Sequence, residues 1–406
     1  MNTRRGSNVS SIKQSNRALI LNTIKQYGGA SRSELAKLTG LSKGGITPII
    51  NEMLAMRLIK ETDVIDTDSG RKPIQLEIDS NCCSFIALDW TRNSYTVAIV
   101  DFAGNIADLV ANRYSSGEGM ETVIINIKNT IASMIERLKT KKIIGIGVVA
   151  PGPLDYKEGI VLTPPNFHGW ANIPIGPILN KRFNLPVFVD NNANAHAIAE
   201  KNYGLGKRYS NFISVVVDEG IGAGIIINDS IYRGNMGFSS EVGHITIDMN
   251  GPKCQCGNVG CLEVYATVPR ILDQINKQIE FVGSYNDGEG YEMDWDEFIN
   301  SIKANDPLCL LAMERVGQYI SNALITLINL FDPQAIIIGS QLAMADNYIR
   351  DPLRKFVYKR VISREFYLPH IYTSNLSYPS LRGGATIAID EFISGTLGDY
   401  EELIAR

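Results

Sequence analysis

The segment SFIALD, residues 84–89, followed by YTVAIVD at 95–101 and IADLV at 106–110, decides the fold of this chain. Runs of this length, rich in β-branched residues, are typical of β-strands. A stretch with helical spacing of apolar residues at 122–138 and a continuous apolar run, IIGIGVV at 143–149, come next. Three strands, a helix and a buried strand together predict an α/β lobe.

A similar order of elements returns later in the chain. Its strand-like and helical segments lie at 212–217, 224–228, 244–248, 267–279, 309–330 and 335–339. A repeated order predicts two similar lobes, with glycine-containing turns after the first strands facing a cleft between them.

The N-terminal part has a different pattern, that of three short helices. Apolar residues recur at helical spacing over 18–27, Ser31 and Glu34 form a capping box that opens a second helix, and Ser42 caps a third. Strand-like segments on both sides of a polar tip at 66–73 complete a winged helix-turn-helix. An ordinary three-helix domain is the alternative, but capping, turn, charge and wing together favour DNA binding.

Charge is divided unevenly along the chain. The whole chain of 406 residues has a net charge of −4, yet residues 1–60 hold ten lysines and arginines against two acids. Residues 1–60, the head, therefore carry a net charge of +8, and the rest of the chain, the body, carries −12. This asymmetry predicts a polyanionic partner for the head alone.

The composition, with 45% hydrophobic and 20% charged residues, is that of a chain with two or three packed domains. No segment reaches the ~18 uncharged apolar residues of a membrane-spanning helix, and no apolar segment follows the basic start. We therefore expect a cytoplasmic protein without a membrane partner.

Half of the six cysteines lie close together, at Cys254, Cys256 and Cys261. With His244 they supply three thiolates and one imidazole within eighteen positions. Zn²⁺ prefers four such ligands in a tetrahedron, and a closed set makes the site structural. We expect bound zinc; three reduced thiols beside an unrelated histidine are the alternative.

The repeat and its motifs resemble the ROK family of sugar kinases and sugar-responsive repressors. The most specific stretch is GFSSEVGHITIDMNGPKCQCGNVGCLE at 237–263, supported by TPPN at 163–166 and NNAN at 191–194. The sequences of these motifs are most similar to those of the xylose repressors of the family. The resemblance covers essentially the whole chain and implies two lobes of the actin and hexokinase (RNase H-like) type behind a winged helix-turn-helix. In this family the His-Cys₃ set holds a structural zinc ion.

A specific sugar pocket needs carboxylates, amides and a histidine converging on one spot, because each hydroxyl both donates and accepts hydrogen bonds. The resemblance places such groups, together with a glycine that lets the backbone approach the ligand, at Gly152, Asn166, Asn191, Asn192, Glu241, His244 and Glu263. His244 could bind zinc through one ring nitrogen and face a hydroxyl with the other. Capping of turns and strand ends explains single members of this group but not the whole.

Three departures from the kinase pattern argue against phosphorylation of the sugar. Asn192 stands where resembling kinases have the aspartate that acts as general base, and an amide cannot take that role. The turn after the first strand, DWTRN at 89–93, lacks the glycines that cradle phosphate. Asp218 and Glu219 put negative charge at the second phosphate turn. A sugar kinase that uses ATP is the alternative.

We therefore expect a sugar-responsive transcriptional repressor, acting as a homodimer or a dimer of dimers on a pseudo-palindromic operator. A third hypothesis is a DNA-binding protein whose body serves only for dimerisation. The predicted boundaries are 1–80 for the winged helix, 81–192 for the first lobe with a C-terminal helix at 384–406, and 193–383 for the second lobe.

The residues expected to face DNA are polar or basic and lie on the helices and the wing: Arg32, Lys43, Thr47, Asn51, Arg71 and Lys72. Amides can read adenine, and arginine enters narrow minor grooves. Pro48 lies inside the expected recognition helix, where it removes an amide and crowds the carbonyl of Gly44; the helix either kinks there or accommodates the ring.

Overall fold

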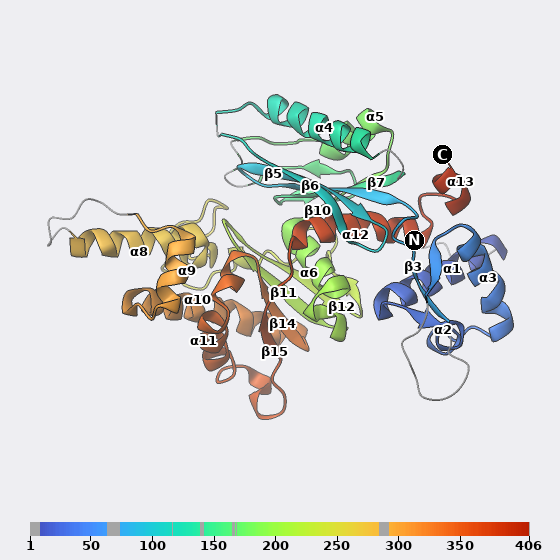
Figure 1. Cartoon of the computed structure of the whole chain (residues 1–406). Helices are drawn as coiled ribbons and strands as arrows, with labels where there is room; N and C mark the ends of the chain where they lie inside the picture. The colour runs from blue at the N-terminus through green and yellow to red at the C-terminus, as the bar shows by residue number, and fades with distance from the viewer. Residues whose placement is uncertain are drawn as a thin grey trace. The chain divides into compact units, whose positions relative to one another are not determined.

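The computed structural model describes residues 9–62, 74–115, 117–138, 142–164, 167, 169–283 and 292–405. The chain forms two compact units, which are described separately (Figure 1). Unit 1 comprises Met1–Asn191 and Ser380–Arg406, and unit 2 comprises Asn192–Pro379. No helix in the described ranges is both long and apolar enough to cross a membrane.

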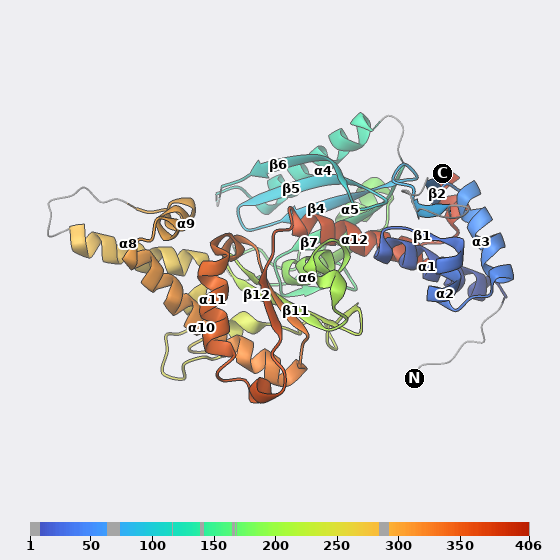
Figure 2. The ribbon, with the colours of Figure 1, turned by 60° about the horizontal axis from the view of Figure 1, so that its bottom comes forward.

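Unit 1 begins with a winged helix-turn-helix, in which three helices lie beside a small antiparallel sheet (Figure 2). Its elements are α1 (Val9–Tyr27), β1 (Ala30–Ser31), α2 (Arg32–Thr39), α3 (Lys43–Ala55), β2 (Ile59–Thr62) and β3 (Gln75–Ile78). The capping box of Ser31 and Glu34 and the cap by Ser42 are confirmed, and Gly40 ends α2 in the left-handed conformation. The wing tip, with Arg71 and Lys72, lies outside the described residues.

The recognition helix α3 continues through Pro48. Pro48 and Gly44 are both exposed. Water can therefore satisfy the carbonyl that loses its amide partner, and the helix need not break.

The first lobe follows the winged helix in unit 1. Its five-stranded sheet has the order β10-β7-β4-β5-β6. Its elements are β4 (Ser84–Trp90), β5 (Ser94–Asp101), β6 (Ile106–Arg113), α4 (Met120–Arg137), β7 (Ile143–Ala150), β8 (Leu154–Asp155), β9 (Ile160–Val161), α5 (Ile175–Phe183) and β10 (Val187–Asn191). All eight residues of β7 are buried, as its continuous apolar run predicts.

The two faces of this sheet bury alternate residues of each strand. Ile86 and Leu88 pack with α4 and α5, while Phe85 and Ala87 pack with α12 (Pro379–Ser394) and the head. Figure 1 shows α4 and α5 on one side of the sheet and α12 on the other. The chain then ends in α13 (Tyr400–Ala405).

The sheet of unit 2 has the order β13-β12-β11-β14-β15. Its strands are β11 (Phe212–Val217), β12 (Ile221–Ile227), β13 (Ser230–Ile231), β14 (Ala335–Gly339) and β15 (His370–Thr373). Its α-helices are α6 (Asn192–Tyr203), α7 (Glu263–Ala266), α8 (Val268–Gly283), α9 (Trp295–Lys303), α10 (Pro307–Phe331) and α11 (Asn347–Val357). Short 3₁₀ turns are η1 (Leu205–Arg208), η2 (Val242–His244), η3 (Gln341–Ala345) and η4 (Ile362–Glu365).

The strand predicted at 244–248 was wrong, and β13 takes its place in the sheet. Ile245 and Ile247 alternate with polar residues as in a strand, but within this segment only Thr246 forms a bridge, an isolated one with Cys261. The main chain of this segment pairs instead with the end of the cysteine loop: the amide of Ile247 donates to the carbonyl of Gly260 at 2.8 Å, and the amide of Leu262 donates to the carbonyl of Ile245 at 3.0 Å.

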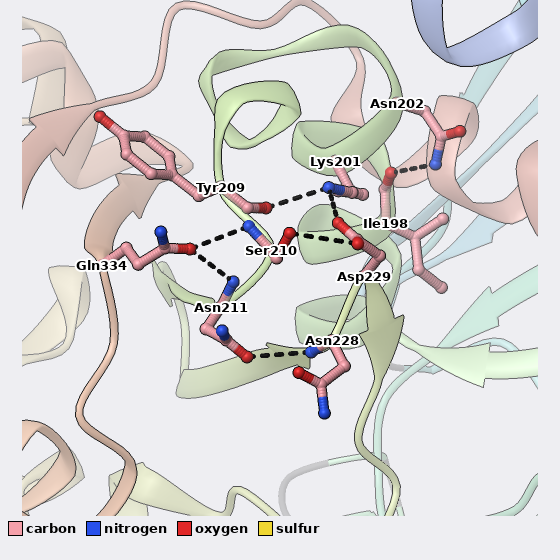
Figure 3. A network of polar contacts seen from close by, with 9 residues as sticks. All are labelled: Ile198, Lys201, Asn202, Tyr209, Ser210, Asn211, Asn228, Asp229 and Gln334. Carbon is pink, nitrogen blue, oxygen red and sulfur yellow. Dashed lines mark hydrogen bonds and ion pairs between the residues drawn. The ribbon is translucent and has the colours of Figure 1, made fainter. Parts of the chain in front are cut away.

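A network of side-chain hydrogen bonds in unit 2 links α6 and Gln334 to the segments beside β11 and β12 (Figure 3). Gln334 Oε1 accepts from the amides of Ser210 and Asn211 at 2.9 and 3.0 Å. Lys201 on α6 donates to the carbonyl of Tyr209 at 3.0 Å and pairs with Asp229, whose pKa this ammonium group lowers. These bonds satisfy main-chain groups at the strand ends and tie α6 to the sheet.

Candidate metal centre and binding residues

His244, Cys254, Cys256 and Cys261 form a cluster that could hold a metal ion, since their ligand atoms all lie within 4.8 Å of one another. His244 Nδ1 is 3.7 Å from Cys254 Sγ, and the sulfurs of Cys256 and Cys261 are 3.7 Å apart. A tetrahedral zinc ion with Zn–S of ~2.3 Å and Zn–N of ~2.05 Å requires edges of about 3.6 to 3.8 Å. These two separations match such edges, while the set as a whole, within 4.8 Å, is somewhat wider.

Tight turns shape the loop that carries the cysteines. The amide of Cys254 donates to the carbonyl of Asn258 at 2.8 Å, and Gly260 has φ +60°. A Cβ at Gly260 would lie 1.7 Å from the carbonyl oxygen of Asp248, so only glycine fits there. Burial raises the pKa of the Cys261 thiol to about 12, so a bound metal must displace that proton.

The second ring nitrogen of His244 faces Glu263. His244 Nε2 lies 3.4 Å from Glu263 Oε2, and Glu263 is the first residue of α7. A carboxylate at this nitrogen fixes the orientation of a metal-binding imidazole. Gly243 makes the approach possible, because a Cβ there would lie 2.4 Å from the carbonyl oxygen of Ile221 and 3.2 Å from Glu263 Oε2.

Glu241 comes directly before η2, and its side chain lies near the same pair. Desolvation by surrounding protein atoms raises the pKa of Glu241, the charge of Glu263 adds to that rise, and His244 opposes it. Three of the predicted sugar-binding residues thus gather at one place in unit 2.

The remaining predicted sugar residues are distributed over both units. Asn191 ends β10 directly opposite Ala150, the last residue of β7, and Gly152 follows Ala150 in the turn to β8. Gly152 and Asn191 thus share the carboxyl end of two parallel strands in unit 1. Asn192 opens α6 in unit 2, and Asn166 lies outside the described residues.

The end of β4 is packed against aromatic side chains of the core. Trp90 is 1% exposed, its ring centroid lies 5.1 Å from that of Phe167, and its Nε1 donates to the hydroxyl of Tyr114 at 3.0 Å. That hydroxyl donates in turn to the carbonyl of Thr91. The bulky Trp90 is therefore part of the core of its lobe.

The turn after β11 holds an internal carboxylate. Asp218 accepts hydrogen bonds from the hydroxyl of Ser340 and, at 3.1 Å, from the amide of Gln341. Burial raises the pKa of Asp218, and these bonds oppose that rise. The donors at the end of β14 are thus engaged by a side chain of the protein itself.

On the head, α3 separates buried from exposed residues along its length. Ile46, Ile49, Ile50 and Met53 are buried. Lys43, Thr47 and Asn51 are exposed, and the hydroxyl of Thr47 donates back to the carbonyl of Lys43 at 2.9 Å. Arg32, predicted to face DNA, is half-buried and hydrogen-bonded to Asn51 and Glu61.

Two residues that these arrangements require could not be recognised from sequence patterns. Gly243 is one of 36 glycines in the chain, and only the close approach of Ile221 and Glu263 distinguishes it. Glu61 has the sequence pattern of an ordinary exposed strand residue, and only the structure shows its contact with Arg32.

The model of the ROK family matches residues 85–391. The xylose repressor of Bacillus subtilis (strain 168) is 31% identical over 390 residues, which cover 94% of this chain and 97% of that protein. The crystal structure of a ROK family transcriptional regulator, a homologue of the Escherichia coli Mlc protein, superimposes with a TM-score of 0.81 at 27% identity. The match covers 98% of this chain and all of that one.

A ROK family glucokinase from Streptomyces griseus, solved with glucose and AMPPNP, gives a TM-score of 0.67 at 25% identity. It covers 75% of this chain and 98% of its own. The match to the family model spans both lobes, and the regulator match extends over the head as well. The chain is a member of the ROK family, with a winged helix-turn-helix followed by two actin-like lobes.

Proposed function

We propose that this protein is a sugar-responsive transcriptional regulator, a repressor that binds operator DNA through its winged helix. The observation that carries the proposal is the length of the matches. The regulator structure covers 98% of the chain, whereas the glucokinase covers 75%. The winged helix is a DNA-binding module, and it is joined here to a body of the sugar kinase type.

The proposed effector is xylose or a related mono- or oligosaccharide, as in the xylose repressor that the chain resembles. The proposed sugar contacts are side-chain amides and carboxylates, the imidazole of His244 and the backbone at a glycine: Gly152, Asn166, Asn191, Asn192, Glu241, His244 and Glu263. Support comes from the contact of Glu263 with His244 Nε2 at 3.4 Å and from the effect of both groups on the pKa of Glu241. A ring of acceptors and donors of this kind suits hydroxyl groups.

The proposed role of zinc is structural. His244 Nδ1 and the three thiolates form a closed set of four ligands, which leaves no position for a substrate. Bound zinc fixes the loop from Cys254 to Cys261 and, through the imidazole, the position of Glu263.

In this proposal the sugar is bound without being phosphorylated. Asn192 has no proton-accepting carboxylate, and loss of a general base alone costs ~10²–10⁴-fold in rate. At the first turn Trp90 is packed into the core instead of a glycine that would expose backbone amides, and Asp218 engages the donors near the second turn. The similarity to a glucokinase keeps kinase activity as the second candidate.

A pair of winged helices suits a pseudo-palindromic operator, because each head binds one half-site. We therefore propose a homodimer or a dimer of dimers, in which sugar binding changes the spacing of the heads. A rigid-body change of spacing can alter operator affinity 5- to 150-fold, the usual range of allosteric coupling.

The experiment has two arms on the same purified protein. In the first, fluorescence anisotropy follows binding to an operator duplex in the presence of pentoses, hexoses and amino sugars. We expect one sugar to change the Kd for DNA. In the second, a coupled assay follows ADP release with ATP and the same sugars. Turnover of ATP with a sugar, without any effect of that sugar on DNA binding, supports the kinase and overturns the proposal.

A further inference from the structure

Arg32, the first residue of α2, joins the recognition helix to the wing. One guanidinium nitrogen donates to Asn51 Oδ1 on α3 at 2.9 Å. Another donates to Glu61 Oε1 on β2 at 3.1 Å. The three residues therefore form a chain of polar contacts from α3 through α2 to the first strand of the wing.

This contact determines which way the amide of Asn51 points. A guanidinium group only donates, so it holds the oxygen of the amide and directs the nitrogen elsewhere. An asparagine reads adenine by donating from Nδ2 and accepting at Oδ1. Because Oδ1 has two lone pairs, the bond from Arg32 leaves one of them for a base.

The same contact changes what Arg32 itself can do. Its charge is paired with Glu61, and its side chain is 35% exposed. A guanidinium group held between a carboxylate and an amide is poorly placed for a DNA phosphate, since a phosphate contact requires that both bonds be rearranged. Lys43 and Thr47, which precede Asn51 on α3, are exposed and are not part of this chain of contacts.

We infer that Arg32 is a positioning residue: it orients the amide of Asn51 for base recognition rather than binding the phosphate backbone. The inference rests on the proposed DNA-binding function. It assigns sequence preference, rather than general affinity, to a residue on the helix before the recognition helix.

Two measurable quantities separate the two roles. The slope of log K against log [salt] is negative. Loss of one phosphate contact reduces its magnitude by about 0.9 and weakens binding to all sequences alike. Loss of an oriented amide leaves that slope unchanged and reduces discrimination at one base pair by about tenfold. A merely structural role would change thermal stability without changing either quantity selectively.

The test begins with duplexes selected by the full-length protein from a randomised DNA library. Anisotropy then gives the Kd for the selected duplex and for its single-base variants at several salt concentrations. The proteins compared are wild type, Arg32→Ala, Asn51→Ala, the double variant, and Lys37→Ala. Lys37 is an exposed lysine on the same helix and provides the same change of charge.

We expect Arg32→Ala and Asn51→Ala to lose preference at the same base pair, and the double variant to lose no more than Asn51→Ala alone. Lys37→Ala keeps that preference, and the salt slope of Arg32→Ala changes no more than that of Lys37→Ala. A lower salt slope for Arg32→Ala with its base preference intact overturns the inference. So does a loss in the double variant that equals the sum of the single losses. A library from which wild type enriches no duplex overturns the proposed function as well.

Discussion

The sheets of the two units have the same strand order, and each is covered on one face by a helix that follows the other sheet. In unit 1, β4, β5 and β6 are antiparallel and β7 and β10 are parallel to β4; in unit 2, β11, β12, β13, β14 and β15 repeat this plan. The helix after β10, α6, belongs to unit 2, and the helix after β15, α12, belongs to unit 1.

A glycine lets a helix backbone approach a strand closely in both units, although the two strands concerned, β7 and β12, do not correspond in the shared plan. A Cβ at Gly147 on β7 would lie 1.8 Å from the carbonyl oxygen of Gly384 on α12. A Cβ at Gly224 on β12 would lie 2.4 Å from the carbonyl oxygen of Ala193 on α6. In both places a helix backbone approaches a strand without a side chain between them.

The units differ in the segments added to this plan. Unit 1 carries the winged helix, and unit 2 carries the cysteine loop between β13 and α7. The shared plan thus accounts for the fold, while the candidate metal site and the DNA-facing helix lie in the added segments. This contrast predicts that damage to an added segment removes one function, whereas damage to the shared packing destabilises a whole unit.

The largest effect is expected for Cys254→Ser. Removal of one of four ligands should release zinc and destabilise unit 2 by about 5 kcal/mol, because free energy of metal binding is also free energy of folding. Metal analysis of the purified protein and denaturant unfolding check this. The control is Cys82→Ser in unit 1, which should keep full metal content; equal metal in both variants would contradict the assignment.

Gly147→Ala and Gly224→Ala should each destabilise the unit that contains them by about 3 kcal/mol, since backbone must move to admit the methyl group. The matched control is Gly44→Ala on α3, where a Cβ meets nothing within 4 Å. It should stabilise the head slightly, through helix propensity. Urea unfolding of the three variants measures these changes, and a small effect at either strand glycine would contradict the close helix contact at that position.

Acid should weaken unit 2 through His196. This residue on α6 is 4% exposed, and burial lowers its pKa from 6.5 to about 4. The unfolded chain therefore binds the proton more readily, so stability is full above pH 6.5 and is lost as the pH falls toward 4. The loss at pH 5 is about 2 kcal/mol.

The measurement is unfolding free energy at pH 8 and pH 5 for wild type and His196→Gln. The variant should lose less stability between these pH values, whatever its stability at pH 8. Unit 1 contains only one histidine, His168, outside the described residues. An equal pH dependence in the two proteins would show that His196 is not the group responsible.

The smallest effect is expected where the head meets α12. Lys25 Nζ lies 2.6 Å from Asp390 Oδ1, but the aspartate side chain is 49% exposed. Such exposed pairs contribute about 0.2 to 1 kcal/mol. A double-mutant cycle with Lys25→Ala and Asp390→Ala should give a coupling energy in this range, and a value of several kcal/mol would mean that the pair anchors the head.

The sequence predicted most of the shared plan, because its central strands are buried on both faces. The apolar runs at 84–89, 143–149 and 335–339 are confirmed as β4, β7 and β14. The segment 244–248 has the alternation of a strand and was wrongly predicted as one. There the cysteine loop, rather than apolar periodicity, determines the backbone.

The candidate sites were predictable only where their residues are close in sequence. The spacing from Cys254 to Cys261 was enough to predict a metal set with His244. The contacts of Arg32 with Asn51 and Glu61 join residues 19 and 29 positions apart, and no local pattern indicates them. Gly243 is explained only by the tertiary approach of Ile221 and Glu263.

The central claim is that the head binds DNA and that unit 2 senses the sugar. Its most direct test is the Kd for a selected operator duplex, measured with and without the most effective sugar. The proteins compared are wild type and Glu263→Gln. We predict that the sugar changes the Kd of wild type by about tenfold or more. Glu263→Gln should bind DNA as wild type does in the absence of sugar and show no response to it. A variant that keeps the sugar response, or a wild type that no sugar affects, would contradict the account.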